Sequence, residues 1–174
     1  CNDFLDREPL DSVTPDNFFF TENDLAAYAV KHYNFTTHEG FNAGIWKNDN
    51  ATDNQAATDY DKKWIPGQWK VPEAYDNPAS NDPWYFSAIR EANYFLETVV
   101  PRFEKGEIEG SETNIKHYIG EMYFLRAKNY LSKLETFGDF PIIKNTLPDE
   151  SESLIQASKR APRYKVAHFI LEDL

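Results

Sequence analysis

The side chains best suited to recognise a ligand are aromatic rings in and beside one stretch rich in proline, glycine, aspartate and asparagine. These rings are Trp46, Trp64, Trp69, Trp84 and Tyr85. Asn42 and several aspartates in the same stretch add hydrogen-bonding groups. Sugars present C–H faces that pack on aromatic rings and hydroxyls that need polar partners, so the set is typical of a neutral-glycan site. We predict ligand contacts from Trp46, Trp69, Trp84, Tyr85 and Asn42. In the alternative interpretation, each tryptophan pins the stretch to the helices.

Groups that could carry out catalysis or bind a metal lack the spacing these sites need. A cluster of aspartates at positions 49, 53, 59 and 61 could surround Ca²⁺, but the EF-hand spacing with its central glycine is absent. No pattern sets two carboxylates opposite each other as in a glycosidase. The histidines have neither metal-ligand spacing nor a nucleophile partner, and no glycine-rich phosphate loop occurs. The sequence therefore predicts no enzyme, metal site or cofactor.

The single cysteine is residue 1, so an internal disulfide is impossible. Processing of bacterial lipoproteins leaves a cysteine first, and its thiol carries the diacylglyceryl group. Cys1 therefore predicts a lipid anchor. The formal net charge of -11 disfavours nucleic acid as a partner, because a polyanion repels phosphate backbones. No apolar run approaches the roughly 18 residues that a membrane-spanning helix needs.

Helices are the elements that would position the candidate side chains. Residues 1–20 are predicted to form an extended arm, and Thr21 to Asp24 a capping box that begins the first helix. No period holds over 41–81, which predicts a long loop. The second helix is predicted to run from Asp82-Pro83 to Pro101, and the third over 113–137 with Gly138 as its stop. A polar loop is predicted at 145–160, and a fourth helix from Pro162 onward. The fold class is therefore all-α.

Two details of side-chain direction follow from these helices. If Pro83 is the first helical residue, Trp84 and Tyr85 point about 100° apart, and Tyr85 lies nearer the apolar face. Trp84 is then predicted to be the more exposed ring. Arg126 falls in the middle of the apolar stripe of the third helix, and Asn93 lies on the stripe of the second. A buried arginine is costly without a partner, so Arg126 is predicted to tie helices together.

Several stretches, taken together and in order, resemble the SusD/RagB family. They are Cys1-Asn-Asp-Phe-Leu-Asp-Arg-Glu-Pro9, Val13-Thr-Pro-Asp-Asn-Phe-Phe with Thr21-Glu-Asn-Asp-Leu25, Ile89-Arg-Glu-Ala-Asn93, Tyr123-Phe-Leu-Arg-Ala-Lys-Asn-Tyr130 with Phe137-Gly-Asp-Phe-Pro-Ile142, and the helix 163–174. The resemblance implies tetratricopeptide-like helix pairs with irregular loops. It also implies that residues 21–174 are the N-terminal helical part of a longer SusD-like domain. The last predicted helix has no stop signal, which favours the same interpretation.

The resemblance further implies a function and a place in the cell. SusD-like proteins are glycan-binding lids of SusC-like TonB-dependent transporter barrels for oligosaccharide or polysaccharide uptake. They are lipid-anchored on the extracellular face of the outer membrane. Because the anchor would hold residue 1 at the membrane, the arm at 1–20 and the first helix are predicted to face the transporter. The alternative function is a helical-repeat adaptor on the outer membrane that binds protein only. A glycan affinity that tryptophan-to-alanine changes abolish would separate the two.

Overall fold

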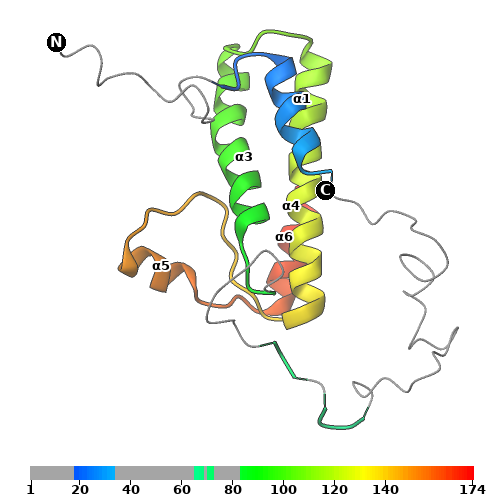
Figure 1. Ribbon diagram of the computed structural model, residues 1–174, viewed down its shortest axis with the longest axis vertical. Coiled ribbons are helices and arrows are strands. Elements are labelled where there is room, and N and C mark those ends of the chain that lie inside the picture. Colours follow the sequence, from blue (N-terminus) through cyan, green and yellow to red (C-terminus); the bar gives the residue numbers. More distant parts are fainter. Residues whose placement is uncertain (1–17, 34–64, 69, 73–82) are drawn as a thin grey trace, which may run out of the picture.

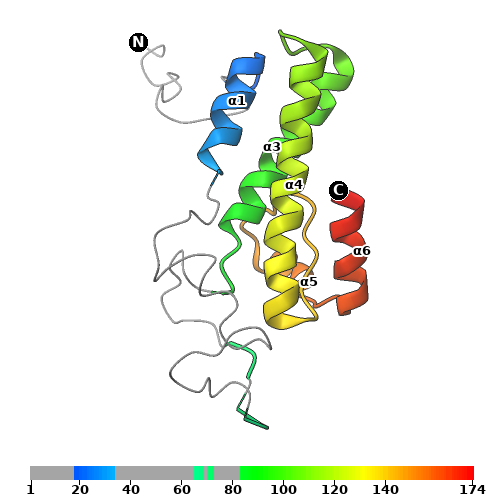
Figure 2. The same ribbon diagram turned by 90° about the vertical axis from the view of Figure 1, so that its right-hand side faces the viewer.

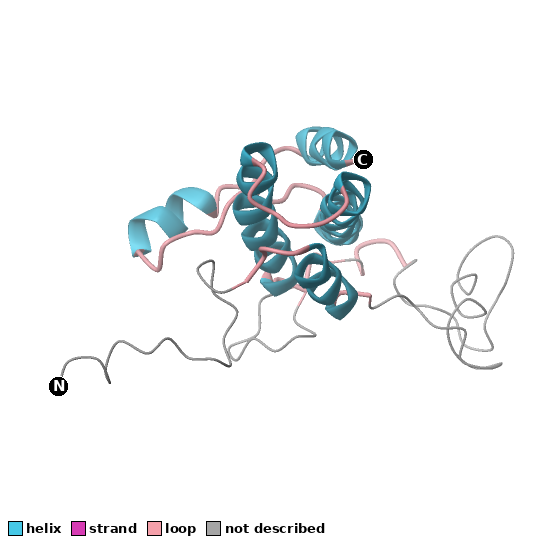
Figure 3. Ribbon diagram, turned by 90° about the horizontal axis from the view of Figure 1, so that it is seen from above, coloured by secondary structure: helices cyan, strands magenta, loops and turns pink. Residues whose placement is uncertain are grey.

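Helices make up all the regular structure in the parts of the chain that the computed structural model describes, residues 18–33, 65–68, 70–72 and 83–174. The helices are α1 (Glu22–Lys31), α3 (Ser87–Lys105), α4 (Glu112–Phe137), α5 (Ser151–Ala157) and α6 (Arg163–Asp173). The long α4 is central and packs against α1, α3 and α6 (Figures 1 and 2). Figure 3 shows helices and loops among the described residues, which confirms the predicted all-α class.

The capping box at the start of α1 forms as predicted. The Asp24 N–H donates to Thr21 Oγ1 at 3.2 Å, and the Thr21 N–H donates to Asp24 Oδ2 at 3.0 Å. The same short stretch pairs with the turn between α3 and α4. The Glu109 N–H donates to the Phe20 carbonyl at 2.7 Å, and the Glu22 N–H donates to the Glu109 carbonyl at 2.8 Å. α1 is thus bound to a turn far along the chain.

Two predicted boundaries of α3 are wrong. The helix begins at Ser87 rather than at Pro83, because residues 83 and 84 form a turn whose Pro83 carbonyl accepts a hydrogen bond from Lys133 Nζ. It also continues through Pro101 to Lys105. Proline removes only one intrahelical N–H donor, and the buried Val99 keeps the last turns against the core. Gly106, with φ of 71°, supplies the left-handed cap that ends the helix.

α4 covers the predicted range and ends at Gly138, as expected. The prediction of a polar loop at 145–160 is wrong in part, because α5 lies within it. An antiparallel bridge closes the base of this excursion: the N–H groups of Phe140 and Ala161 each donate to the other residue's carbonyl, at 3.1 and 3.0 Å. As a result α5 stands away from the other helices, at the left of Figure 1.

Two apolar clusters hold the helices together. The first joins α1, α3 and the N-terminal half of α4 around the fully buried Phe19, and the second joins α6, the C-terminal half of α4 and the start of α3 around Tyr130 and Phe140. Phe19 has a φ of 71°, which is rare for an aromatic residue. Its ring lies within 6 Å of Tyr28, Tyr94 and Phe95, and these contacts hold the strained residue in place. None of the described helices combines the length and the apolar character required to cross a membrane.

Candidate functional site

A groove with a volume of about 620 Å³ lies between the start of α3 and α5, and the predicted ligand residue Trp84 is part of its lining. We call it the α3–α5 groove. Its volume lies in the usual range for small-ligand sites. Its lining is mainly apolar with a few polar side chains: Trp84, Phe86, Ile89, Arg90, Asn93, Pro141, Ile143, Asn145, Leu147, Pro148, Asp149, Leu154, Ala157 and Ser158.

Aromatic residues before α3 form one end of the groove. The Trp84 ring lies 4.1 Å from the Phe137 ring and 5.7 Å from the Phe140 ring, centroid to centroid. Its indole N–H donates to the Pro72 carbonyl at 2.8 Å. Phe86 stacks on Phe140 at 5.1 Å. These rings are held by the core rather than by a free loop, so they lose little entropy if a ligand packs on them.

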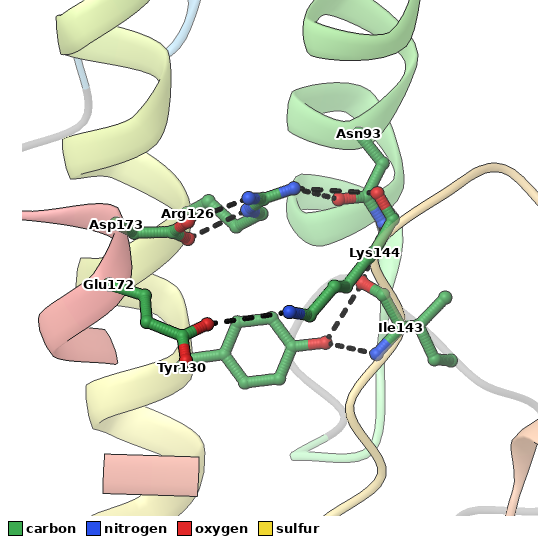
Figure 4. A network of polar contacts seen from close by, with 7 residues as sticks. All are labelled: Asn93, Arg126, Tyr130, Ile143, Lys144, Glu172 and Asp173. Carbon is green, nitrogen blue, oxygen red and sulfur yellow. Dashed lines mark hydrogen bonds and ion pairs between the residues drawn. The ribbon is translucent and has the colours of Figure 1, made fainter. Parts of the chain in front are cut away.

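One wall of the groove is the extended segment after α4, and buried polar groups hold it in place. Asn93, which is fully buried, donates from Nδ2 to the Ile143 carbonyl at 2.8 Å. The Tyr130 hydroxyl donates to the same carbonyl at 3.2 Å and accepts from the Ile143 N–H at 2.8 Å (Figure 4). Burial raises the pKa of Tyr130 to about 12, so the hydroxyl stays protonated. Farther along, the Thr146 N–H donates to Glu97 Oε2 at 2.8 Å.

Arg126 connects this wall to the last helix. Its Nε and Nη2 donate to the two carboxylate oxygens of Asp173, each at 2.7 Å. Its Nη1 donates to Asn93 Oδ1 at 2.9 Å and to the Lys144 carbonyl at 3.4 Å (Figure 4). The prediction that Arg126 is buried and ties helices together is confirmed. The arginine lies outside the groove and positions it through Asn93 and residue 144.

Two of the predicted ligand residues, Trp84 and Tyr85, are among the described residues. Trp84 lines the groove and is half-buried, whereas the neighbouring Tyr85 is exposed and does not line it. The predicted order of exposure is therefore wrong, because both residues precede the helix and the 100° rule for adjacent helical residues does not apply to them. The hydrogen bond from Trp84 to the Pro72 carbonyl also attaches residue 72 to the helices, as the alternative interpretation of the tryptophans predicted. Asn42, Trp46, Trp64, Trp69, the aspartate cluster and Cys1 lie outside the described residues.

Several groove residues were missed by sequence reasoning. Arg90 belongs to the Ile89–Asn93 motif, but no periodic pattern indicated that it would border a hollow. Asn145, Asp149 and Ser158 lie in the stretch predicted as a polar loop. Their convergence depends on the Phe140–Ala161 bridge, which pairs residues 21 positions apart and leaves no local signal in the sequence.

Comparison of the chain with known proteins identifies its family. The model of a SusD-like family, described as starch-binding and associating with the outer membrane, matches residues 3–174. The SusD-like protein P2 of Formosa agariphila is 25% identical over 180 residues, which cover 100% of this chain and 34% of that protein. The chain thus spans about a third of the length of the curated relative that it matches. No solved structure matches. The family's description names binding and no reaction, in agreement with the prediction of a non-enzyme. The chain belongs to the SusD-like family.

Proposed function

We propose that the protein binds an oligosaccharide at the α3–α5 groove and acts as the lid of a SusC-like TonB-dependent transporter. The observation that carries the glycan-binding part is the groove itself. Its volume is about 620 Å³, and it combines core-held aromatic rings with the side chains of Arg90, Asn145, Asp149 and Ser158. Aromatic surface suits the C–H faces of a sugar, and the polar groups suit its hydroxyls. The family description as starch-binding supports the same function.

The proposed lid role rests on the family resemblance, and the proposed lipid anchor rests on Cys1. A cysteine that carries two or three acyl chains is anchored stably, whereas a single chain is marginal. The extracellular face of the outer membrane is the location at which a lid on an importer can meet its glycan. Predicted contacts from Trp46, Trp69, Asn42 and Tyr85 remain part of this proposal, with Tyr85 beside the groove and the other three outside the described residues.

A pair of matched variants tests the glycan site. Ala157 lines the groove from α5, so Ala157→Trp places an indole inside it. Gln156, one residue earlier, is exposed and does not line the groove, so Gln156→Trp adds the same ring elsewhere on α5. Calorimetric titration with a panel of oligosaccharides should show binding by wild type and Gln156→Trp, with affinity lowered at least tenfold in Ala157→Trp. Equal affinity in all three would exclude the groove as the site.

One separate observation favours the alternative, a protein-binding adaptor. Large apolar side chains are exposed on two helices, at Phe124 and Leu131 on α4 and at Tyr164 and Leu171 on α6. Exposed apolar surface of this kind marks interaction sites in many proteins. A protein that binds the transporter but no glycan in the panel would be explained by the adaptor function.

A further inference from the structure

We propose that the α3–α5 groove selects glycans that carry negative charge, as a carboxylate or a sulfate ester, and that Arg90 recognises that charge. This inference rests on the proposed glycan-binding function. Arg90 projects from α3 and is exposed. It lines the α3–α5 groove and also an adjoining pocket of about 500 Å³, whose lining includes Tyr28, Tyr94 and Thr146. A ligand that occupies the groove or extends into the pocket therefore meets this guanidinium.

The guanidinium of Arg90 has no bonded partner within the described part of the chain. Three and four residues away along α3, where helical ion pairs form, stand Ser87, Asn93, Phe86 and Tyr94, and none is acidic. No hydrogen bond or ion pair joins its guanidinium to any other described residue. An arginine without a bonded partner keeps its donors available for a ligand.

The nearby carboxylates of the pocket have other partners. Glu91 accepts from Ser87 Oγ at 3.0 Å and pairs with Lys31 at 3.2 Å. Glu97 accepts from the N–H and the hydroxyl of Thr146. Glu91 is thus paired with a cation, whereas Glu97 is bonded to the neutral Thr146 and keeps its negative charge in the pocket. The guanidinium of Arg90 is bonded to neither of these carboxylates where the groove and the pocket meet.

The chemistry of the Arg90 side chain suits an anionic ligand. A guanidinium forms paired hydrogen bonds with carboxylate or sulfate oxygens, and these bonds are about twice as strong as those to a neutral hydroxyl. Arg90 is exposed in the free protein, and a ligand bound against the apolar lining of the groove would exclude water from these bonds. Asp149 also lines the groove and opposes an anion, so the charged group should bind at Arg90 and away from Asp149.

The test compares acidic sugars with matched neutral forms on the full chain. Hexagalacturonate is paired with its methyl ester, and a sulfated carrageenan hexasaccharide with its desulfated form, so that the two sources of charge are distinguished. Wild type, Arg90→Gln, Asp149→Asn and Lys105→Gln are titrated with each. Lys105 is exposed at the other end of α3 and controls for the loss of one positive charge from the same helix.

We expect wild type to bind an acidic sugar more tightly than its neutral form. Arg90→Gln should weaken acidic binding roughly 10- to 100-fold, the scale of a lost hydrogen bond to a charged group, and should weaken neutral binding by a much smaller factor. Asp149→Asn should strengthen acidic binding, and Lys105→Gln should behave as wild type. Neutral sugars bound as tightly as acidic ones, with no effect of Arg90→Gln, would overturn this inference and leave the glycan-binding function standing. Binding of no sugar in either form would overturn both.

Discussion

Arg126 of α4 and Asp173 of α6 form a bidentate ion pair, with both nitrogen–oxygen distances at 2.7 Å and both side chains almost fully buried. The pair joins two helices that also share the apolar cluster around Tyr130. Through Asn93 and the Lys144 carbonyl it also holds the wall of the α3–α5 groove. One buried contact thus links the packing of the last helix to the shape of the candidate site.

Arg126→Ala should strongly destabilise the protein. The change leaves a buried carboxylate and the buried Asn93 Oδ1 without their donor, which lowers the free energy of unfolding by about 3–5 kcal/mol. Urea denaturation measures the loss. The control is Lys116→Ala, which removes an exposed i,i+4 pair with Glu112 and should leave stability nearly unchanged. A similar effect in both variants would contradict the importance of the buried pair.

Gly110→Ala should weaken the attachment of α1 to the α3–α4 turn. Gly110 has a φ of 139°, and an added Cβ would lie 2.6 Å from Glu22 Oε2 and 2.7 Å from Glu22 Cβ. Strain and displacement of Glu22 should lower stability by about 1–3 kcal/mol. Gly120 in α4 offers a matched control, because a Cβ there meets nothing within 4 Å. Gly120→Ala should raise stability by about 0.5–1 kcal/mol, since alanine favours helix. Thermal unfolding compares the two.

Trp84→Ala should reduce stability as well as any ligand binding. The ring packs on Phe137 and Phe140 and its N–H is bonded to Pro72, so truncation should lower the free energy of unfolding by about 2–4 kcal/mol. Tyr85→Ala, at an exposed ring, should stay within about 0.5 kcal/mol of wild type. Chemical denaturation gives both values. A neutral Trp84→Ala would mean that the ring is not held as the structure shows.

His32 should make stability depend on pH below neutrality. Burial lowers the pKa of His32 from its ordinary value, and the nearby Glu91 offsets this only in part. Because the unfolded chain then binds the proton more readily, the stability contributed by neutral His32 is present above about pH 6.5 and declines as pH falls, by at most about 1.4 kcal/mol per unit. Denaturation from pH 7.5 to 5 should show a smaller decline in His32→Gln than in wild type. Equal slopes would rule out His32 as the source.

Cys1 should carry the lipid if the proposed anchor is correct. Cells that express the wild-type precursor should incorporate labelled palmitate into the protein, and cells that express Cys1→Ala should not. Label that persists in the variant would reject Cys1 as the acylation site.

Local signals in the sequence were sufficient for part of this fold. The capping box at Thr21 and the stop at Gly138 depend on residues within a few positions, and both form as predicted. Arg126 was identified because a charge in the middle of a regular apolar stripe must be buried and paired. Its partner Asp173 lies 47 residues away on another helix, and no pattern in the sequence pointed to it.

The start of α3 and the groove show where local reasoning fails. Asp82-Pro83 has the pattern of a helix start, yet contacts of Trp84 with Phe137 and Pro72 keep the chain in a turn until Ser87. The groove lies beside the segment that carries α5, and the Phe140–Ala161 bridge closes the base of that segment. Tertiary contacts decide both features, and they involve residues that are distant in sequence.

The pairing of the chain around Thr21 with Glu109 has a mechanical consequence. Tension applied to the chain ahead of Phe18 acts first on the hydrogen bond of 2.7 Å from Arg102 Nη1 to the Phe18 carbonyl. It also acts on the two backbone hydrogen bonds that join Phe20 and Glu22 to Glu109. The Phe19 ring, buried between these bonds, must also leave the core before the load can reach α1. This stretch therefore acts as a clamp that shields the helices from tension on the N-terminal side, and α1 unwinds only after the clamp has opened.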